Sequence, residues 1–334
     1  MADPAPYTSA RLSVAPMIDW TDRFCRYFHR RFSKHALLYT EMITAPALIH
    51  GDAARLLAYD QSEHPVALQI GGSDPEQLAI ATRMGVDAGY DEINLNVGCP
   101  SDRVQSGCFG AVLMKDPKLV ADCVAAMREA AGTTPVTVKS RIGVDDQDPR
   151  HVLPDFLSHV IDAGAAQVTI HARKAWLQGL SPKENRDIPP LDYPLVHQMK
   201  AAFPDTALSI NGGITSLDDA QSQLRIMDGV MIGRAAYQTP TNILGSADRR
   251  IFGANTPDVT AEEAVIAMFD FIEDELTKGT RLHQITRHML GAFAGRPGAR
   301  GWRRHLSSEA TKPGADLTTL RAALSLVEDL AIAA

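Results

Sequence analysis

The residue best suited to do chemistry in this sequence is Cys99, in the segment NLNVGCPSDRV. An apolar run ends just before Gly98, which permits a turn, and Pro100 stiffens the loop that follows, so we expect the thiol to be displayed. Because a thiol with a pKa near ~8.5 stays mostly protonated at neutral pH, it is a better acid than nucleophile. We interpret Cys99 as a general acid, and spacing alone leaves open that it is incidental.

The other cysteines carry no comparable signal. Cys25, Cys108 and Cys123, taken with Cys99, are too few and too irregularly spaced for a disulfide framework or a CxxC zinc site. We interpret Cys108, in SGCFG, and Cys123, on an expected helix, as structural or dispensable. We expect no metal site.

Polar side chains end several apolar runs, among them Gln69, Lys139 in VTVKSR and His171 in QVTIH. Burying an unpaired ammonium costs several kcal/mol, so Lys139 must meet an anion, and an electron-rich cofactor ring would serve. A salt bridge to Glu41 is the alternative. His171 and Gln69 are equally compatible with hydrogen-bonded core residues.

Two glycine motifs indicate a phosphate site. SINGGI places Asn211, Gly212 and Gly213 after one expected strand, and VMIGRAA places Gly233 and Arg234 after the next. Glycine lets backbone N–H groups approach an anion closely, and a helix N-terminus adds its dipole. A Gly-Gly pair alone is also a common tight turn, but together the two motifs predict a phosphorylated cofactor or substrate.

The elements that must position these residues read as an α/β fold. Eight apolar, nearly continuous runs alternate with helical patterns, and eight parallel strands close a barrel. Polar residues near the ends of these runs would line the active-site face of a (β/α)8 TIM barrel, whereas an open doubly wound sheet has its site only at one switch point. We therefore predict the barrel. The runs are Leu12 to Met17, Leu37 to Met42, Val66 to Ile70, Glu92 to Val97, Val136 to Arg141, Gln167 to His171, Ala207 to Asn211 and Gly229 to Gly233, and their polar ends are Met17, Glu41, Gln69, Asn94, Asn96, Lys139, His171, Asn211 and Arg234.

Residues 1–250 are predicted to form this barrel, and residues 251–334 a small all-helical domain. Asp116-Pro117 predicts a capped helix start, while Gly143 to Val152 and Ala172 to Pro194 are expected to be long loops. In the C-terminal part we expect helices at Ala261 to Leu276, Leu282 to Phe293 and Asp316 to Ala331, with a basic turn from Gly295 to Arg304 between the second and third.

Charge is unevenly distributed over the 334 residues. The chain carries a net charge of −7, yet the segment from Thr277 to Lys312 carries +7 and the remainder −14. Such asymmetry indicates a surface that faces a polyanion, although a solvated helix face is the alternative. The composition excludes global disorder. No apolar stretch is long enough to span a bilayer and the start lacks a leader-like pattern, so we expect a cytoplasmic protein without a membrane or an obligate protein partner.

These motifs together resemble the tRNA-dihydrouridine synthases, most closely their A subfamily. The resemblance spans nearly the whole chain, and its HARKAWLQGLSPKENR and GWRRHLS segments favour this subfamily over flavin barrels in general. The matching segments are VAPMIDWTDRFCR, LNVGCPSDRVQSG, TVKSRIGVDD, IHARKAWLQGLSPKENR, INGGI, MIGRAAYQ and GARGWRRHLS.

The resemblance implies an FMN-bearing barrel, NADPH as reductant, and a helical domain that binds tRNA, with D-loop uridines at positions 20 and 20a as substrates. Cys99 would donate a proton to C5 of uracil after hydride reaches C6, and Lys139 would stabilise the reduced flavin. The implied FMN contacts are Ala15, Pro16, Met17, Gln69, Lys139, His171, Asn211, Gly212, Gly213, Gly233 and Arg234; the implied tRNA contacts are Asn96, Lys183, Arg186, Arg300 and Arg303.

Two other functions are compatible with parts of the sequence. An FMN barrel that reduces a free pyrimidine, of the dihydroorotate or dihydropyrimidine dehydrogenase kind, would share the glycine loops and the loop cysteine but would not need a basic C-terminal domain. A non-catalytic RNA-binding barrel would carry no flavin, so the colour of the purified protein separates it from either enzyme.

Overall fold

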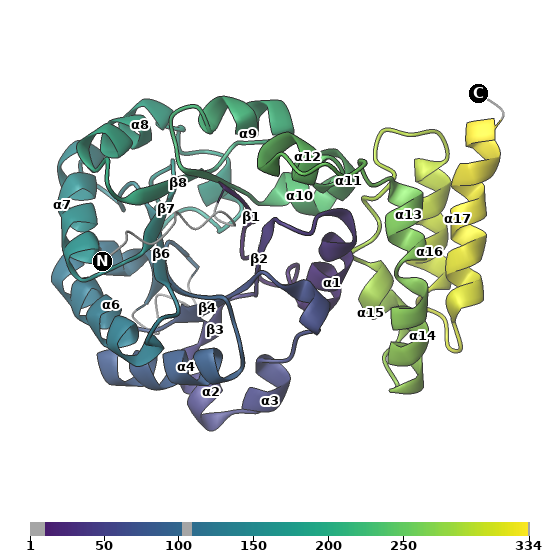
Figure 1. Cartoon of the computed structure of the whole chain (residues 1–334), viewed down its shortest axis with the longest axis horizontal. Helices are drawn as coiled ribbons and strands as arrows, with labels where there is room; N and C mark the ends of the chain where they lie inside the picture. Colours follow the sequence, from purple (N-terminus) through teal and green to yellow (C-terminus); the bar gives the residue numbers. More distant parts are fainter. Residues whose placement is uncertain (1–10, 102–108, 333–334) are drawn as a thin grey trace.

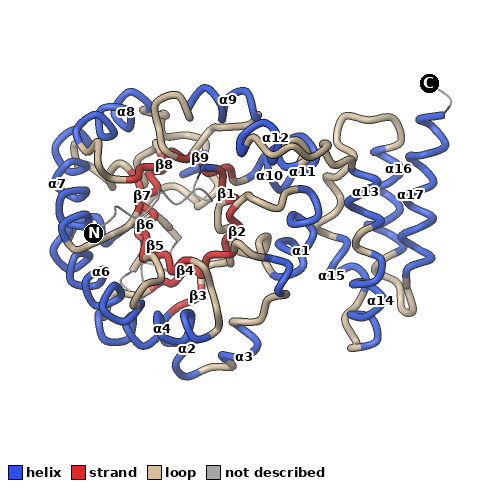
Figure 2. The backbone as a smooth tube through the Cα atoms, viewed as in Figure 1, coloured by secondary structure: helices blue, strands red, loops and turns tan. Residues whose placement is uncertain are grey.

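A closed parallel barrel forms the larger part of the molecule. The computed structural model describes residues 11–101 and 109–332. Nine strands form one sheet in the order β2-β1-β9-β8-β7-β6-β5-β4-β3, and an additional pairing of β2 with β4 closes eight of them into a ring (Figure 2). The barrel predicted from the eight apolar runs is confirmed.

The barrel strands fall where the apolar runs placed them. They are β1 (Leu12–Val14), β2 (Leu37–Tyr39), β4 (Val66–Gly71), β5 (Glu92–Val97), β6 (Val136–Arg141), β7 (Gln167–His171), β8 (Ala207–Asn211) and β9 (Gly229–Ile232). The first run was expected to reach Met17 but its strand ends at Val14, and Pro16, which lacks an N–H, cannot extend the ladder. The second run was expected to reach Met42, but its strand ends at Tyr39. A short β3 (Ile43–Thr44) pairs only with the end of β4.

Helices cover the outside of the ring (Figure 1). Three of them start at Asp-Pro pairs, in which the aspartate accepts a hydrogen bond from an N–H in the first turn. This occurs at α4 (Pro75–Asp87), at α6 (Pro117–Ala131), as expected for Asp116, and at α7 (Pro149–Asp162). Because α7 begins at Pro149, the loop expected to run to Val152 ends earlier. The remaining helices are α1 (Arg23–Phe32), α2 (Ala45–His50), α3 (Ala53–Leu56), α8 (Tyr193–Ala202), α9 (Leu217–Gln223), α10 (Arg234–Gln238), α11 (Pro240–Leu244) and α12 (Ala247–Phe252).

Five helices follow the barrel: α13 (Ala261–Ile266), α14 (Phe269–Thr277), α15 (Leu282–Thr286), α16 (Ala299–Glu309) and α17 (Leu317–Ile332). The expected helix from Ala261 to Leu276 is interrupted after Ile266, and that from Leu282 ends at Thr286. The predicted basic turn from Gly295 to Arg304 is wrong in its second half, since α16 begins at Ala299. Trp302 and Leu306, four residues apart, are buried on one face of α16 and hold it as a helix.

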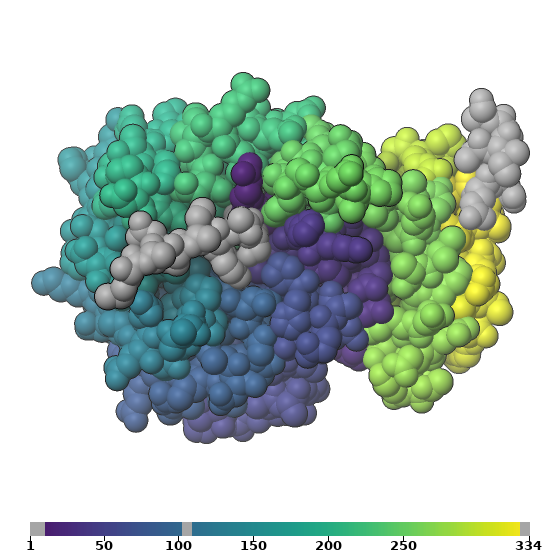
Figure 3. Space-filling view, viewed as in Figure 1, coloured from purple at the N-terminus to yellow at the C-terminus, as the bar shows by residue number. Residues whose placement is uncertain are grey.

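The C-terminal helices form a lobe beside the barrel, and α1 lies between the two (Figures 1 and 3). Tyr27 of α1 stacks on Phe271 of α14 with ring centroids 3.8 Å apart, and Arg23 forms an ion pair with Glu275. The barrel and the lobe therefore share one apolar contact region. No helix in the described part of the chain is long and apolar enough to cross a membrane.

Candidate active site

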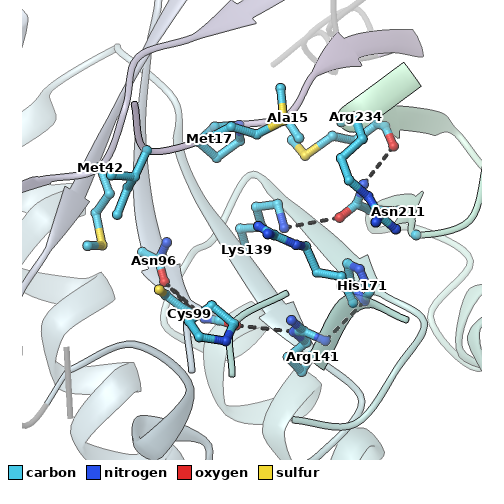
Figure 4. Close-up of a pocket in the computed structure, with 18 of the residues that line it drawn as sticks. Ala15, Met17, Met42, Asn96, Cys99, Lys139, Arg141, His171, Asn211 and Arg234 are labelled. Carbon is cyan, nitrogen blue, oxygen red and sulfur yellow. Dashed lines mark hydrogen bonds between the residues drawn. The ribbon is translucent and has the colours of Figure 1, made fainter. Parts of the chain in front are cut away.

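A cavity of about 460 Å³ opens at the carboxyl ends of the barrel strands (Figure 4). It brings together most of the residues singled out from the sequence: Ala15, Pro16, Met17, Gln69, Asn96, Cys99, Lys139, His171, Arg186, Asn211, Gly212, Gly213, Gly233 and Arg234. Glu41 and Asn94, expected with the other polar strand ends, do not line it. Asn94 is buried inside the barrel, one inward-facing position before Asn96 on β5.

The Asn96 side chain holds the start of the loop that carries Cys99. The Oδ1 atom of Asn96 accepts hydrogen bonds from the backbone N–H of Gly98 at 3.1 Å and of Cys99 at 3.0 Å. The thiol donates to Ser101 Oγ at 3.4 Å and is partly exposed in the cavity. The expected display of Cys99 is therefore confirmed.

The remaining cysteines do not reach this cavity where the structure describes them. Cys25 is buried on α1 and Cys123 is buried on α6. Burial raises the pKa of the Cys123 thiol to about 12, so it stays protonated at neutral pH. Cys108 lies outside the described residues.

Lys139 lines the cavity, and its contacts there decide between the anionic partners that the sequence left open, a cofactor or Glu41. Its Nζ donates to Asn211 Oδ1 at 3.1 Å, and within the described residues it forms no ion pair with Glu41 or another carboxylate. Asn211 is itself oriented by donating to the backbone carbonyl of Met231 at 2.8 Å. Burial and the neighbouring Arg141 lower the pKa of Lys139 to about 7. An anion in the cavity would therefore be its strongest partner.

Arg141 is a cavity residue that the sequence analysis passed over. Its guanidinium donates to the carbonyls of Gly98 at 3.2 Å and Asn185 at 3.0 Å, so it ties the Cys99 loop to the loop after β7. It also donates to Nδ1 of His171 at 3.4 Å. The available signal was its spacing, because Arg141 follows Lys139 by two residues on β6 and so faces the same side of the strand.

His171 is neutral in this cationic setting. Burial, together with Arg141 and Lys139, holds the pKa of His171 well below its ordinary value. Since Arg141 donates to Nδ1, the ring proton is on Nε2, which leaves His171 a neutral donor.

The glycine loop after β8 requires glycine at both positions. Gly212 and Gly213 adopt φ values of +105° and +73°, which other residues rarely adopt. A Cβ on Gly212 would lie 3.0 Å from the His171 ring, and one on Gly213 would lie 2.4 Å from Leu191. The loop backbone therefore packs closely against the side chains of His171 and Leu191.

The loop after β7 carries two of the residues expected to contact RNA, Lys183 and Arg186. Lys183 is exposed and does not line the cavity, whereas Arg186 does, and its Nε atom is buried without a hydrogen-bond partner among the described residues. Asp187 accepts from Arg234 at 2.7 Å and so joins this loop to the residue after Gly233. Asn185, fully buried, holds the loop by bonding the backbone N–H and carbonyl of Trp176.

Arg300 and Arg303 lie on α16, away from the cavity lining, and are exposed. The eight basic residues of the Thr277 to Lys312 segment divide into two groups. Lys278, Arg287, Arg296 and Lys312 pair with carboxylates. For Arg281, Arg300, Arg303 and Arg304 no ion pair forms within the described residues, so about half of the segment's positive charge is internally compensated.

Comparison with known proteins identifies close relatives. A family model described as dihydrouridine synthase matches residues 13–328. The chain is 58% identical over 320 residues to the tRNA-dihydrouridine(20/20a) synthase of Vibrio parahaemolyticus, covering 96% of this chain and 97% of the relative. It is 60% identical over 320 residues to the protein of that name from Salmonella typhi, covering 96% of each. It is 59% identical over 322 residues to that of Escherichia coli K12, covering 96% of this chain and 92% of the relative.

Solved structures with the same architecture are more distant. An old yellow enzyme homologue from Zymomonas mobilis superposes with a TM-score of 0.53 at 13% identity, over 78% of this chain and 95% of that one. Morphinone reductase in complex with tetrahydroNAD superposes with a TM-score of 0.51 at 15% identity, over 76% and 90%. At these identities the likeness shows the barrel fold alone.

Proposed function

Since the chain belongs to the dihydrouridine synthase family, we propose that it reduces the C5–C6 double bond of uridines in tRNA to give 5,6-dihydrouridine. The expected targets are D-loop uridines at positions 20 and 20a, the positions that the names of its relatives give. We place this reaction in the cytoplasm, where its tRNA substrate is found. The observation that carries the proposal is a displayed thiol, Cys99, on the same cavity as Lys139 and the glycine loops.

The cavity suits a flavin mononucleotide. Among the described residues its lining has four cationic side chains, those of Lys139, Arg141, Arg186 and Arg234, against the single carboxylate of Asp19. The buried, unpartnered Nε of Arg186 and the N–H of the exposed residue Gly213 are donors that an anionic group could use. We assign flavin contacts to Ala15, Pro16, Met17, Gln69, Lys139, His171, Asn211, Gly212, Gly213, Gly233 and Arg234, with NADPH as the reductant.

When bound, reduced flavin supplies the hydride that adds to C6 of uracil. The Sγ–H of Cys99 then supplies the proton at C5, so that a hydride and a proton together saturate the double bond. The Asn96 side chain keeps the Cys99 loop in place by accepting hydrogen bonds from the backbone N–H groups of Gly98 and Cys99. Lys139 and the neutral His171 offer donors toward negative charge in the cavity.

A folded D-loop packs its uridines away from solvent, so the target base must swing out to enter the cavity at a cost of about a few kcal/mol. Phosphate contacts from Lys183, Arg186, Arg300 and Arg303 would offset this cost and make affinity fall with salt. One N–H of the Asn96 side chain donates to Gln69, and the second N–H could reach the base.

Incubation of the holoenzyme with an unmodified tRNA transcript and NADPH, followed by mapping of reduced uridines, tests this function. We expect reduction at positions 20 and 20a. The matched control is Cys99→Ala, which should keep its flavin but lose turnover on tRNA because only the proton donor is removed. Reduction of free uracil or orotate instead of tRNA would favour the free-pyrimidine alternative, and loss of flavin in Cys99→Ala would contradict the role of the thiol.

A further inference from the structure

A continuous chain of hydrogen bonds runs down the inside of the barrel from the Cys99 loop. In every link the donor lies on the Cys99 side and the acceptor on the Glu92 side. The links are Cys99 N to Asn96 Oδ1 at 3.0 Å, Asn96 Nδ2 to Gln69 Oε1 at 2.8 Å, Gln69 Nε2 to Asn94 Oδ1 at 2.8 Å, Asn94 Nδ2 to Thr137 Oγ1 at 2.7 Å, and Thr137 Oγ1 to Glu92 Oε1 at 2.6 Å. Tyr39 also donates its hydroxyl to Glu92 Oε1.

Strand geometry places these side chains together. Glu92, Asn94 and Asn96 alternate along β5 and so all point into the barrel. Gln69 on β4 and Thr137 on β6 are the register partners of Asn94 on either side. Glu92 and Asn94 are fully buried, so these bonds are shielded from bulk solvent.

The two ends of the chain fix its direction. At the upper end, two backbone N–H groups point at the Oδ1 atom of Asn96, and a backbone N–H can only donate. At the lower end, Glu92 Oε1 accepts from two hydroxyls. Every side-chain amide between them therefore turns its oxygen toward the cavity and its NH₂ group toward Glu92, since a reversed amide would face donor to donor.

We propose that Glu92 is a positioning residue for the reaction: it terminates the hydrogen-bond chain that orients Gln69 and Asn96 and thereby holds the Cys99 loop. The role of Glu92 in the reaction rests on the proposed function, whereas its role in holding the Cys99 loop rests on geometry alone. Only the acceptor Oε1 is needed, and the partner oxygen Oε2 has no hydrogen-bond partner among the described residues. Burial raises the pKa of Glu92 to about 7 despite the bonds from Thr137 and Tyr39, and Oε1 accepts in either protonation state.

Removing the acceptor leaves the Thr137 hydroxyl free to donate to Asn94, which competes with the direction imposed by the backbone N–H groups. The amides of Asn94, Gln69 and Asn96 are then held from the upper end alone, and the support that Asn96 gives to the Cys99 loop is weakened. A displacement of this kind lowers the rate of the chemical step more than the affinity for substrate.

The test compares Glu92→Leu, which removes the acceptor, with Glu92→Gln, which keeps a carbonyl oxygen there. In the full-length holoenzyme we expect Glu92→Leu to lower kcat on tRNA by on the order of tenfold to a hundredfold with KM within a few fold. In the same full-length Glu92→Leu variant, the rate at which iodoacetamide alkylates Cys99, followed by peptide mass spectrometry, should differ severalfold from the wild-type rate. Glu92→Gln should retain both properties.

Gln167→Leu is the matched control, because Gln167 is also a buried amide inside the barrel but bonds Ser209 and lies outside the chain. Equal losses in Gln167→Leu and Glu92→Leu, equal losses in Glu92→Gln and Glu92→Leu, or unchanged Cys99 alkylation in Glu92→Leu would overturn the proposal. Should Glu92→Leu not fold, Thr137→Val breaks the same chain at one link and must show the same kcat and alkylation changes. The alkylation result stands even if the wild-type chain reduces no tRNA.

Discussion

The charge state of Lys139 depends strongly on its surroundings. It lies beside Arg141 in a cavity where cations outnumber carboxylates, and burial together with that guanidinium lowers its pKa to about 7. Near neutral pH the side chain of the ligand-free protein is therefore divided between the ammonium and the amine. A bound anion favours the ammonium, so binding of the anion and of a proton to Lys139 are coupled.

The first prediction follows from this coupling. Between pH 7 and 9, above the second pKa of a phosphate at about 6, the affinity of the cofactor-free protein for FMN should fall by up to about tenfold per pH unit, because Lys139 must take up a proton to meet the anion. Fluorescence titration of FMN at a series of pH values measures this. In Lys139→Met the affinity should be lower at pH 7 and nearly flat with pH. An equally steep slope in that variant would reject the role of Lys139.

At the scale of elements, α16 presents two kinds of residue on opposite faces. Trp302 is fully buried and donates from Nε1 to the Met289 carbonyl at 3.1 Å, while Arg300 and Arg303 are exposed. The Trp302 indole thus anchors the helix in the core, while the guanidinium groups of Arg300 and Arg303 lie outside the core. Replacing the arginines should leave the fold intact.

The second prediction uses this separation. The double variant Arg300→Ala with Arg303→Ala should weaken tRNA binding and reduce the slope of log affinity against log salt by about 1.4–1.8, the value for two phosphate contacts. Filter binding at several salt concentrations measures the slope, and NADPH oxidation without RNA should not change. Lys118→Ala with Arg150→Ala, exposed cations on α6 and α7, is the matched control and should keep the wild-type slope. Equal slopes in the two double variants would contradict the assignment.

The sequence predicted the elements that local chemistry determines. The β-branched run around Lys139 and the capped start at Asp116 fall where they were expected, because strand burial and helix capping act within a few residues. The segment after Gly295 was misread as a turn because its glycines and proline outweighed the spacing of Trp302 and Leu306. Burial of these two side chains, with Trp302 packed against Phe293, stabilises α16.

Cross-strand relations were beyond the sequence. Lys139, Cys99 and the glycine loops could be placed at one end of a barrel from their positions after strands, and the structure brings them to one cavity. The pairing of Arg141 with the Gly98 carbonyl depends on the register between β5 and β6, which no local pattern encodes. The runs expected to be nearly continuously apolar instead place polar residues such as Asn94 inside the ring, where Asn94 bonds Gln69 and Thr137 on the two neighbouring strands.

At the scale of the whole molecule, one segment joins the cavity to the C-terminal lobe. Residues 15–19 line the cavity, and Asp22 follows as the N-cap of α1. Asp22 Oδ2 accepts from Arg287 at 2.7 Å and from His288 at 3.0 Å, both beyond α15. Trp20 stacks on Tyr237 at 4.4 Å. Docking of the lobe therefore constrains the cavity wall.

The third prediction tests this junction with Asp22→Asn, which keeps an N-cap but loses the carboxylate. Although burial raises the pKa of Asp22, the bonds from His288 and Arg287 lower it to about 2 from 3.8. Since the folded pKa is the lower one, the charge stabilises the fold above pH 4, and this contribution, on the order of 2 kcal/mol, is lost as pH falls toward 2. Asp22→Asn should therefore unfold at lower temperature at pH 7 and should also retain flavin less well, because the wall segment 15–19 is released.

Asp116→Asn separates the junction from the cap. Asp116 caps α6 by accepting from the Leu119 N–H at 3.1 Å, and it has no contact with the C-terminal lobe among the hydrogen bonds and ion pairs of the described residues. Asparagine caps a helix about as well as aspartate, so this variant should match the wild type in melting temperature and flavin retention. If Asp22→Asn lowers the melting temperature but leaves flavin retention unchanged, the lobe stabilises the barrel without constraining the cavity, and the coupling between them is refuted.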